Sequence, residues 1–74
     1  MNWIKVEDRL PDTYNELVAE SETLILRTLD IDSDYIVYSL GSYNYNMNAW
    51  RYDYGDEIRE EVVTHWAVIE PPKD

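Results

Sequence analysis

The 74-residue chain contains no cysteine, so it can form neither disulfides nor thiolate metal sites. Its two glycines lie too far apart for a glycine-rich phosphate-binding loop. Its one histidine, His65, is too few for the usual histidine sets of zinc sites. The sequence also lacks a long apolar run and a basic segment leading into one, so it predicts neither a signal peptide nor a membrane span. We therefore expect a cytoplasmic protein without a metal or a cofactor.

Positive charge is scarce as well. Six Lys and Arg stand against sixteen Asp and Glu, which gives a formal net charge of −10. This exceeds the magnitude of about 2–8 that keeps a small domain soluble. Such a field repels phosphate backbones and anionic membranes, so direct binding to nucleic acid or to a membrane is not expected. Hydrophobic residues make up 45% of the chain, which is too apolar for a disordered acidic tail and indicates one small folded domain, residues 1–74.

The hydrophobic pattern predicts an α+β fold with a small antiparallel sheet. Branched, aromatic and alternating segments at 23–29, 35–40, 48–54 and 62–69 indicate about four strands connected as a meander. Residues 3–6 are apolar-rich and could add an N-terminal strand at the sheet edge. Among the residues expected in the core are Trp3, Leu24, Leu26, Ile36, Trp50 and Trp66.

One short helix is predicted before the first long strand. Thr13 and Glu16 match the capping box that often opens a helix, and Tyr14, Leu17 and Val18 would share one face. We therefore expect a helix at 13–20. Pro11 prevents it from extending back toward the N-terminus.

Both ends of the chain carry motifs that resemble a known family. "WIKVEDRLP" at 3–11 and "VTHWAVIEPP" at 63–72 are similar to the opening and closing motifs of short proteins, mostly from phages and prophages, that are classed as a domain of unknown function. The chain departs from that family at residues 67–69 and has a longer segment at 14–22. The resemblance implies a phage or mobile-element setting in a bacterial host cell. It implies no catalytic residue.

The segment "DIDSD" at 30–34 has carboxylates at alternate positions, as the first part of a calcium loop does. The rest of that loop is missing, because Tyr35 and Gly41 stand where a Gly and a bidentate Glu are required. The sequence therefore favours a solvated acidic turn. Neighbouring carboxylates elsewhere are numerous, but acid catalysis needs one carboxyl group removed from water, and we expect no enzyme. His65 is expected to be structural.

The segment 43–54, "YNYNMNAWRYDY", is rich in Tyr and Asn. Aromatic platforms that bind single-stranded nucleic acid need a basic groove, and Arg51 is the only cation here. Trp50 and Tyr52 are expected in the core. Tyr43 and Tyr45 could instead lie on a protein-binding surface, where Tyr gives contact area at low entropic cost.

Two functions remain open. Carboxylates two apart in an extended chain project to one side at about 6.6 Å intervals, which makes a row of negative charge. In a meander, the acidic connections "DIDSD" at 30–34 and "GDEIREE" at 55–61 would lie at the same end of the sheet. The chain could then mimic nucleic acid and block a basic nucleic-acid-binding host protein of a defence complex, as an inhibitor of the anti-CRISPR or anti-restriction type. The alternative is a small protein-binding or ligand-binding module with a Tyr/Asn-rich surface. The predicted partner-binding residues are Asp30, Asp32, Asp34, Asp56, Glu57, Glu60, Glu61, Tyr43 and Tyr45.

Overall fold

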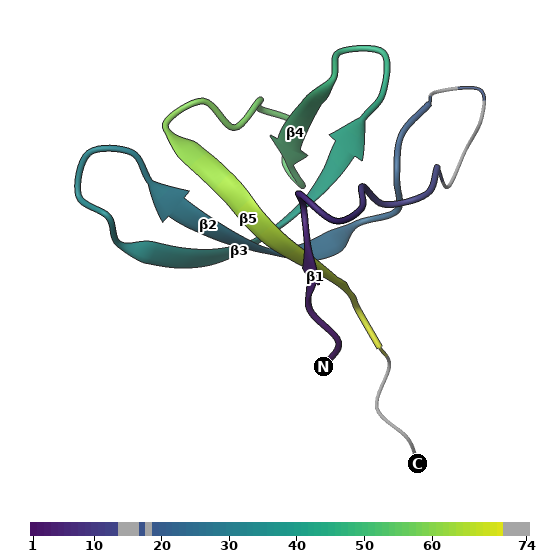
Figure 1. The fold of residues 1–74 in the computed structure, drawn as a ribbon. Coiled ribbons are helices and arrows are strands. Elements are labelled where there is room, and N and C mark those ends of the chain that lie inside the picture. Colours follow the sequence, from purple (N-terminus) through teal and green to yellow (C-terminus); the bar gives the residue numbers. More distant parts are fainter. Residues whose placement is uncertain (14–16, 18, 71–74) are drawn as a thin grey trace.

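The structure is a computed structural model that describes residues 1–13, 17 and 19–70. Its strands are β1 (Ile4–Lys5), β2 (Leu24–Asp30), β3 (Ile36–Asn44), β4 (Ala49–Tyr52) and β5 (Glu61–Val68). They form one five-stranded antiparallel sheet in the order β1-β5-β2-β3-β4 (Figure 1). The described residues include no helix that is long and apolar enough to cross a membrane.

β2 lies at the centre of the sheet and has the alternation typical of a strand with two unlike faces. Leu24, Leu26 and Thr28 are buried on one face, which we call the inner face. The residues between them are half-buried on the opposite, outer face. The Thr28 hydroxyl donates a hydrogen bond to the carbonyl of Val37 at 3.1 Å, so the one polar side chain in this buried row has a partner.

The pairing of β2 fixes which parts of the chain meet. Leu24 lies opposite Gly41 of β3 on one side and Val68 of β5 on the other. A register shift near the middle of the β2–β5 pair adds a residue to β5, and the pair then runs on to Asp30 opposite Glu61. The end of β2 and the start of β5 therefore lie side by side.

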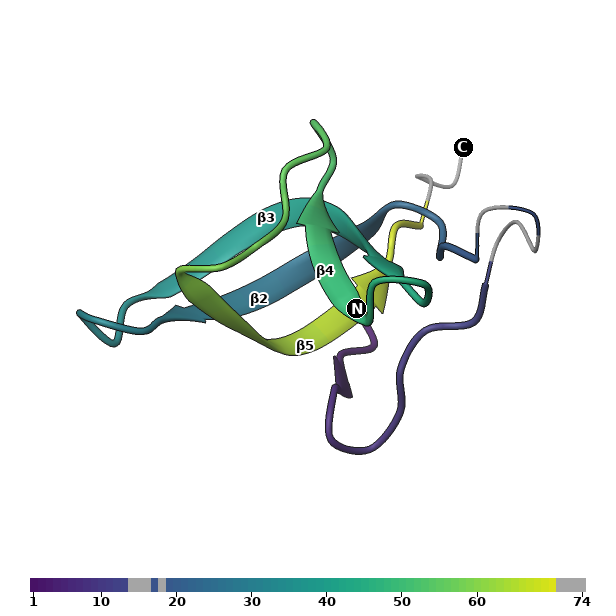
Figure 2. The ribbon, with the colours of Figure 1, turned by 90° about the horizontal axis from the view of Figure 1, so that it is seen from above.

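The core covers the inner face of the sheet. Trp66 of β5 is 4% exposed, and its indole nitrogen donates to the carbonyl of Arg9 at 2.8 Å. Figures 1 and 2 show β4 and the loop from β4 to β5 on the same side of β2 and β5, and this places Trp50 and Ile58 against the core. The buried cluster is Leu24, Leu26, Val63 and Trp66, with Ile4, Val6, Trp50 and Ile58 packed against it.

The predicted α+β class is wrong, because the described residues form an all-β fold without a helix. Residues 14–16 and 18 of the predicted helix lie outside the described residues. At the end of this segment Ala19 has a positive φ of 49°, which a helix does not allow. Its carbonyl accepts from the amide of Tyr45 at 2.7 Å, and the amide of Ser21 donates to the carbonyl of Tyr43 at 2.9 Å. The Ala19 carbonyl and the Ser21 amide therefore bond to the end of β3 and not to a helical turn.

The simple meander is also wrong, because β5 pairs with β2 and β1 and does not pair with β4. The additional N-terminal strand is present as β1. Among the predicted core residues, Leu24, Leu26 and Trp66 are buried, and Trp50 is half-buried against them. Two others are not in the core: Trp3 is 37% exposed and Ile36 is 47% exposed. Their strand neighbours place them on the outer face, which no second layer among the described residues covers.

Candidate functional site

The acidic residues predicted as a site come from two segments of the chain. Asp30 ends β2 and is followed by the β2–β3 turn with Asp32 and Asp34, and the others belong to the loop before β5 and to the first residue of β5. Segments 30–34 and 53–61 together contain one cation, Arg59. The carboxylates beside the β2–β5 pairing, which we call the acidic end, are Asp30, Asp32, Asp34, Glu60 and Glu61.

The β2–β5 pairing brings the turn and the start of β5 together. Asp30 is the cross-strand partner of Glu61. One residue further, the amide of Ile31 donates to the carbonyl of Glu60 at 3.1 Å. Two like charges directly opposite each other on neighbouring strands are destabilising, so this pairing is kept at a cost in stability. The Asp30 turn thus lies beside Glu60 and Glu61 at one end of the sheet. Asp56 and Glu57 lie beside β4 instead, where the Asp56 carbonyl accepts from the Tyr52 amide at 2.8 Å and Glu57 forms a β-bridge with Arg51.

Asp30 shapes the turn. Its Oδ1 accepts hydrogen bonds from the amides of Asp32 at 2.9 Å and Ser33 at 3.0 Å. These bonds, with that of Ser33 first, lower the pKa of the Asp30 carboxyl below its usual value, because they favour the charged form. Asp34 completes the turn with a φ of 59°, a conformation that Asp tolerates better than most residues. The side chains of Asp32 and Asp34 are exposed.

Tyr52 connects the acidic end to β4. Its hydroxyl donates to Oε1 of Glu61, and the pKa of Tyr52 is raised above its usual value, first by this hydrogen bond and then by burial. The Tyr52 ring stacks on Tyr54, with ring centroids 5.0 Å apart. A hollow of about 240 Å³ follows the loop, and it is lined by Tyr52, Tyr54, Asp56, Glu57, Arg59 and Glu60. Glu57 accepts from Arg59 Nε at 3.3 Å, whereas Asp56 and Glu60 have no ion-pair partner among the described residues.

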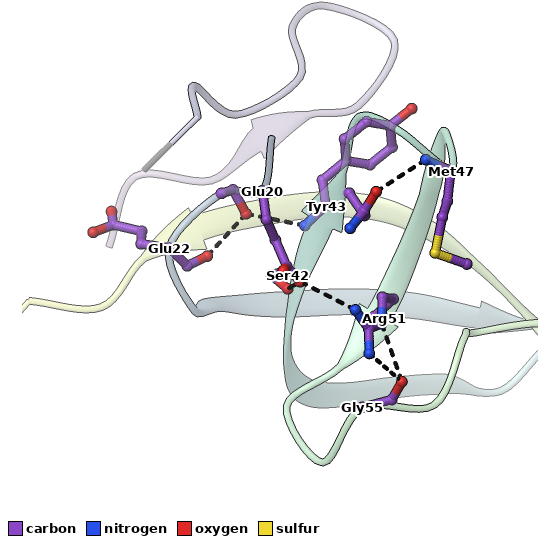
Figure 3. A network of polar contacts seen from close by, with 9 residues as sticks. Glu20, Glu22, Ser42, Tyr43, Met47, Arg51 and Gly55 are labelled. Atoms are coloured by element: carbon purple, nitrogen blue, oxygen red, sulfur yellow. Dashed lines mark hydrogen bonds and ion pairs between the residues drawn. The ribbon is translucent and has the colours of Figure 1, made fainter. Parts of the chain in front are cut away.

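Arg51 holds the start of this loop and does not neutralise the acidic end. Its Nε and Nη2 donate to the carbonyl of Gly55 at 3.0 and 2.8 Å, and its Nη1 lies 3.9 Å from Oε1 of Glu20 (Figure 3). Ser42 also donates to that Glu20 oxygen at 2.6 Å. Gly55 has a φ of 107°, which favours glycine. The cation is therefore used to fold the loop.

The two tyrosines predicted at the site lie elsewhere, at the opposite end of β3. Tyr43 is 7% exposed, and its ring contacts those of Tyr45 and Trp50 edge-on, with centroids 4.9 and 5.0 Å away. The Tyr45 hydroxyl donates to the carbonyl of Pro11, and the pKa of Tyr45 is raised, first by burial and then by the charge of Asp12. Tyr45 thus holds the N-terminal segment against the sheet, and the Tyr43 ring packs between Tyr45 and Trp50. Both tyrosines lie apart from the acidic end.

His65 of β5 packs against an aromatic ring on the outer face of the sheet. Its ring meets the Trp3 ring edge-on at 6.5 Å, and its Nδ1 lies 2.9 Å from the Thr64 hydroxyl and 3.4 Å from Arg27 Nη1. No group of three or more His, Asp or Glu side chains in the described part of the chain is arranged to hold a metal ion. The carboxylates of "DIDSD" therefore do not converge.

The sequence reasoning missed a second surface, formed by apolar residues of β3 and its neighbours. Ile36 is 47%, Tyr38 61% and Leu40 42% exposed, and all three lie on the outer face. Further across this face, Val62 of β5 is 53% exposed, and the ring of Trp3, just before β1, lies 5.8 Å from that of Tyr38. The signal was available in "YIVYSL", which is apolar at nearly every position and so has no polar face to turn toward water.

The fold and the acidic end define a small acidic all-β domain. The chain belongs to a family described as protein of unknown function (DUF551), whose profile matches residues 2–73. No curated protein matches the chain. No solved structure matches it either.

Proposed function

We propose that this protein is an acidic inhibitor of the phage type that binds a basic host protein through its acidic end. It would mimic nucleic acid and block a nucleic-acid-binding site of a defence complex, of the anti-CRISPR or anti-restriction kind, in the cytoplasm of a bacterial host cell. In this proposal the chain acts by occupying a site, without catalysis and without a cofactor. The partner is a protein, and the chain does not bind nucleic acid itself.

The observation that supports this proposal is the pairing of Asp30 with Glu61 at the end of the sheet. This pairing collects carboxylates from separate segments, although like charges at that distance repel each other. Each strand of duplex DNA carries one negative charge per about 3.4 Å of axis. A sheet end with exposed Asp32, Asp34 and Glu60 offers a row of anions to a groove that holds phosphates.

The alternative, a binding module that uses a Tyr/Asn-rich surface, has less support. Tyr43 is 7% exposed and Tyr45 is half-buried, so neither ring offers the free face that such a surface needs. The contact surface proposed here therefore consists of carboxylates and omits both tyrosines.

A competition experiment tests the proposal. Labelled duplex DNA or guide RNA is bound to a purified CRISPR effector or restriction enzyme, and its displacement by this protein is followed by fluorescence anisotropy. The variant Asp32→Lys/Glu60→Lys changes exposed residues of the acidic end and leaves the Asp30 turn bonds intact. We expect it to weaken competition by about tenfold or more, because several charge pairs form together in the contact.

The matched control is Glu22→Lys/Glu70→Lys. It changes the net charge by the same amount at exposed residues that lie next to Leu24 and Val68, at the opposite end of the sheet. We expect it to weaken competition by less than about threefold, through the general field alone. Equal losses for the two variants, or no displacement of nucleic acid from any such protein, would refute the mimicry.

A further inference from the structure

The first half of β3 is an open sheet edge. β3 pairs with β2 from Ile36 to Gly41, but β4 pairs with β3 only from Gly41 to Asn44. Residues 36–40 therefore have β2 along one side and no strand of the described chain along the other. Figures 1 and 2 both show this half of β3 reaching beyond β4 toward the β2–β3 turn.

The backbone of this edge has donors and acceptors that point outward. The amide of Asp30 donates to the carbonyl of Tyr35 at 2.9 Å, which fixes the alternation of bonds along the β2–β3 pair. Tyr35, Val37 and Ser39 then direct their N–H and C=O groups to β2, and those of Ile36 and Tyr38 point away from it. The edge ends where the carbonyl of Leu40 accepts from the amide of Asp53 at 3.0 Å.

The edge has none of the features that usually protect such strands from pairing. Residues 36–40, "IVYSL", include no proline and no charged residue, and no register shift interrupts the pairing of β3 with β2. Val37 is 37% exposed on the inner face, and Ile36 and Tyr38 are more exposed on the outer face. An added strand would thus gain backbone hydrogen bonds together with apolar contacts on both faces.

The charges at the two ends of the edge indicate what kind of strand fits. The acidic turn with Asp32 and Asp34 precedes Ile36, and Asp53 stands where the edge stops. An antiparallel second copy of β3 would bring the acidic turn of each chain toward Asp53 of the other, and like charges would repel. A strand with Lys or Arg at both ends and apolar residues between them is complementary at both ends.

We propose that the open edge of β3 accepts an extended segment of a partner protein as an additional strand, with β-branched residues at its centre and basic residues at both ends. This site shares Asp32 and Asp34 with the acidic end, but its main element is the backbone of β3. It requires backbone pairing along β3, whereas mimicry requires only the charges of the acidic end, so one proposal can fail while the other holds.

Synthetic peptides provide the probe. The blocked peptide Lys-Val-Thr-Val-Thr-Val-Lys is titrated into the ¹⁵N-labelled protein, and amide shifts and hydrogen exchange are followed by NMR. We expect a saturable change in which the Ile36 and Tyr38 amides become protected from exchange. A peptide with Glu in place of both Lys residues should bind at least about tenfold more weakly, because its ends repel the flanking carboxylates.

Two controls separate strand pairing from attraction by charge. In the first, the basic peptide carries N-methyl groups on alternate residues, which leaves its charge unchanged and removes backbone donors, so its binding should be lost. In the second, Tyr38→Pro removes the outward N–H of β3 and no bond to β2, and it should abolish protection while the remaining spectrum stays folded. If this variant does not fold, binding of the N-methylated peptide to the unaltered protein still tests whether the peptide pairs as a strand.

Several results would overturn the proposal. They are equal binding of the basic and acidic peptides, binding that N-methylation does not change, and peptide binding without protection of Ile36 and Tyr38. A concentration-dependent dimer that protects the same two amides in the absence of peptide would show that a second copy is the occupant. The basic strand would then be the wrong partner.

Discussion

Individual carboxylates at the acidic end differ in what they do for the fold. Asp30 holds the turn through its bonds to the amides of Asp32 and Ser33. Because its pKa is lowered in the folded protein, this contribution to stability is present above the unfolded-state pKa and is lost as the pH falls below it. Asp32 and Glu60 are exposed and lie beside this turn, so they can be changed without removing its bonds. Substitutions that test function should therefore be made at exposed residues such as Asp32 and Glu60.

Tyr52 supplies a pH-dependent prediction. Its pKa is raised above the ordinary value of 10.0, mainly because its hydroxyl donates to Glu61. A raised pKa means that the folded state keeps the proton longer than the unfolded chain does. The stability from this bond is thus fully present below pH 10 and declines as the pH rises beyond it. We expect Tyr52→Phe to lose about 1–2 kcal/mol near pH 7 and much less at high pH, as measured by urea unfolding across the alkaline range.

The control for Tyr52→Phe is Tyr35→Phe, which removes the hydroxyl of a tyrosine that is 73% exposed. This variant should keep both the stability near pH 7 and the alkaline loss of the original chain. A Tyr52→Phe variant whose stability declines above pH 10 as steeply as that of the original chain would show that this hydroxyl does not bond to Glu61 in solution.

At the scale of elements, the local sequence pattern predicted the strands well. It failed where contacts between residues far apart in the sequence determine the structure. The alternation in residues 24–30 is strong enough to define β2 and its buried Leu24 and Leu26. The capping-box pattern at 13–16 did not predict the end of that segment correctly, because backbone groups of Ala19 and Ser21 bond to β3. The position of β5 beside β2 depends on pairing between residues about forty apart, which no local pattern reports.

The β3–β4 pair depends on a glycine. A Cβ added at Gly41 would lie 2.3 Å from the Arg51 carbonyl oxygen and 2.7 Å from Leu26 Cδ1. Both distances are far below van der Waals contact, and the first is to backbone, which cannot move aside without shifting β4. We expect Gly41→Ala to destabilise the protein by about 1–3 kcal/mol or more, as for overpacked cores, in denaturant or thermal unfolding.

Ser39→Ala provides the contrast two residues earlier on the same face of β3. The Ser39 hydroxyl is buried and has no hydrogen-bond partner among the residues that the structure describes. Its removal should leave stability unchanged or raise it slightly, because an unsatisfied buried hydroxyl is costly. If Gly41→Ala proved as harmless as Ser39→Ala, the close approach of β4 to β3 at Gly41 would be wrong.

At the scale of the whole molecule, the sequence predicted the presence of an acidic surface better than its details. Clusters at 30–34 and 56–61 are visible in the sequence, but the expectation that they share one end of the sheet fits only 30–34 and 60–61, which the pairing of Asp30 and Glu61 brings together. The reason differs, since that expectation assumed a meander and the contact arises from β5 pairing with β2. Tyr43 was misplaced because a tyrosine beside asparagines looks like a surface residue, while its burial depends on Trp50 and the N-terminal segment.

The net charge of −10 on one small domain makes stability depend on salt. The range of charge repulsion falls from about 30 Å in 0.01 M salt to about 10 Å in 0.1 M salt. Added NaCl should therefore raise the melting temperature by several degrees over this range, at about 4–8 °C per kcal/mol for a domain of this size.

Asp32→Asn/Glu60→Gln should melt higher than the original chain in low salt and respond less to NaCl. Glu22→Gln/Glu70→Gln removes the same charge from the far end of the sheet. It should raise the melting temperature in low salt, and reduce the response to NaCl, to a smaller degree. Differential scanning calorimetry in a low-salt buffer measures all three proteins. Equal gains from the two variants would mean that the acidic end is no more strained than the rest of the surface, and a melting temperature that ignores salt would mean that the repulsion is not a significant cost to the fold.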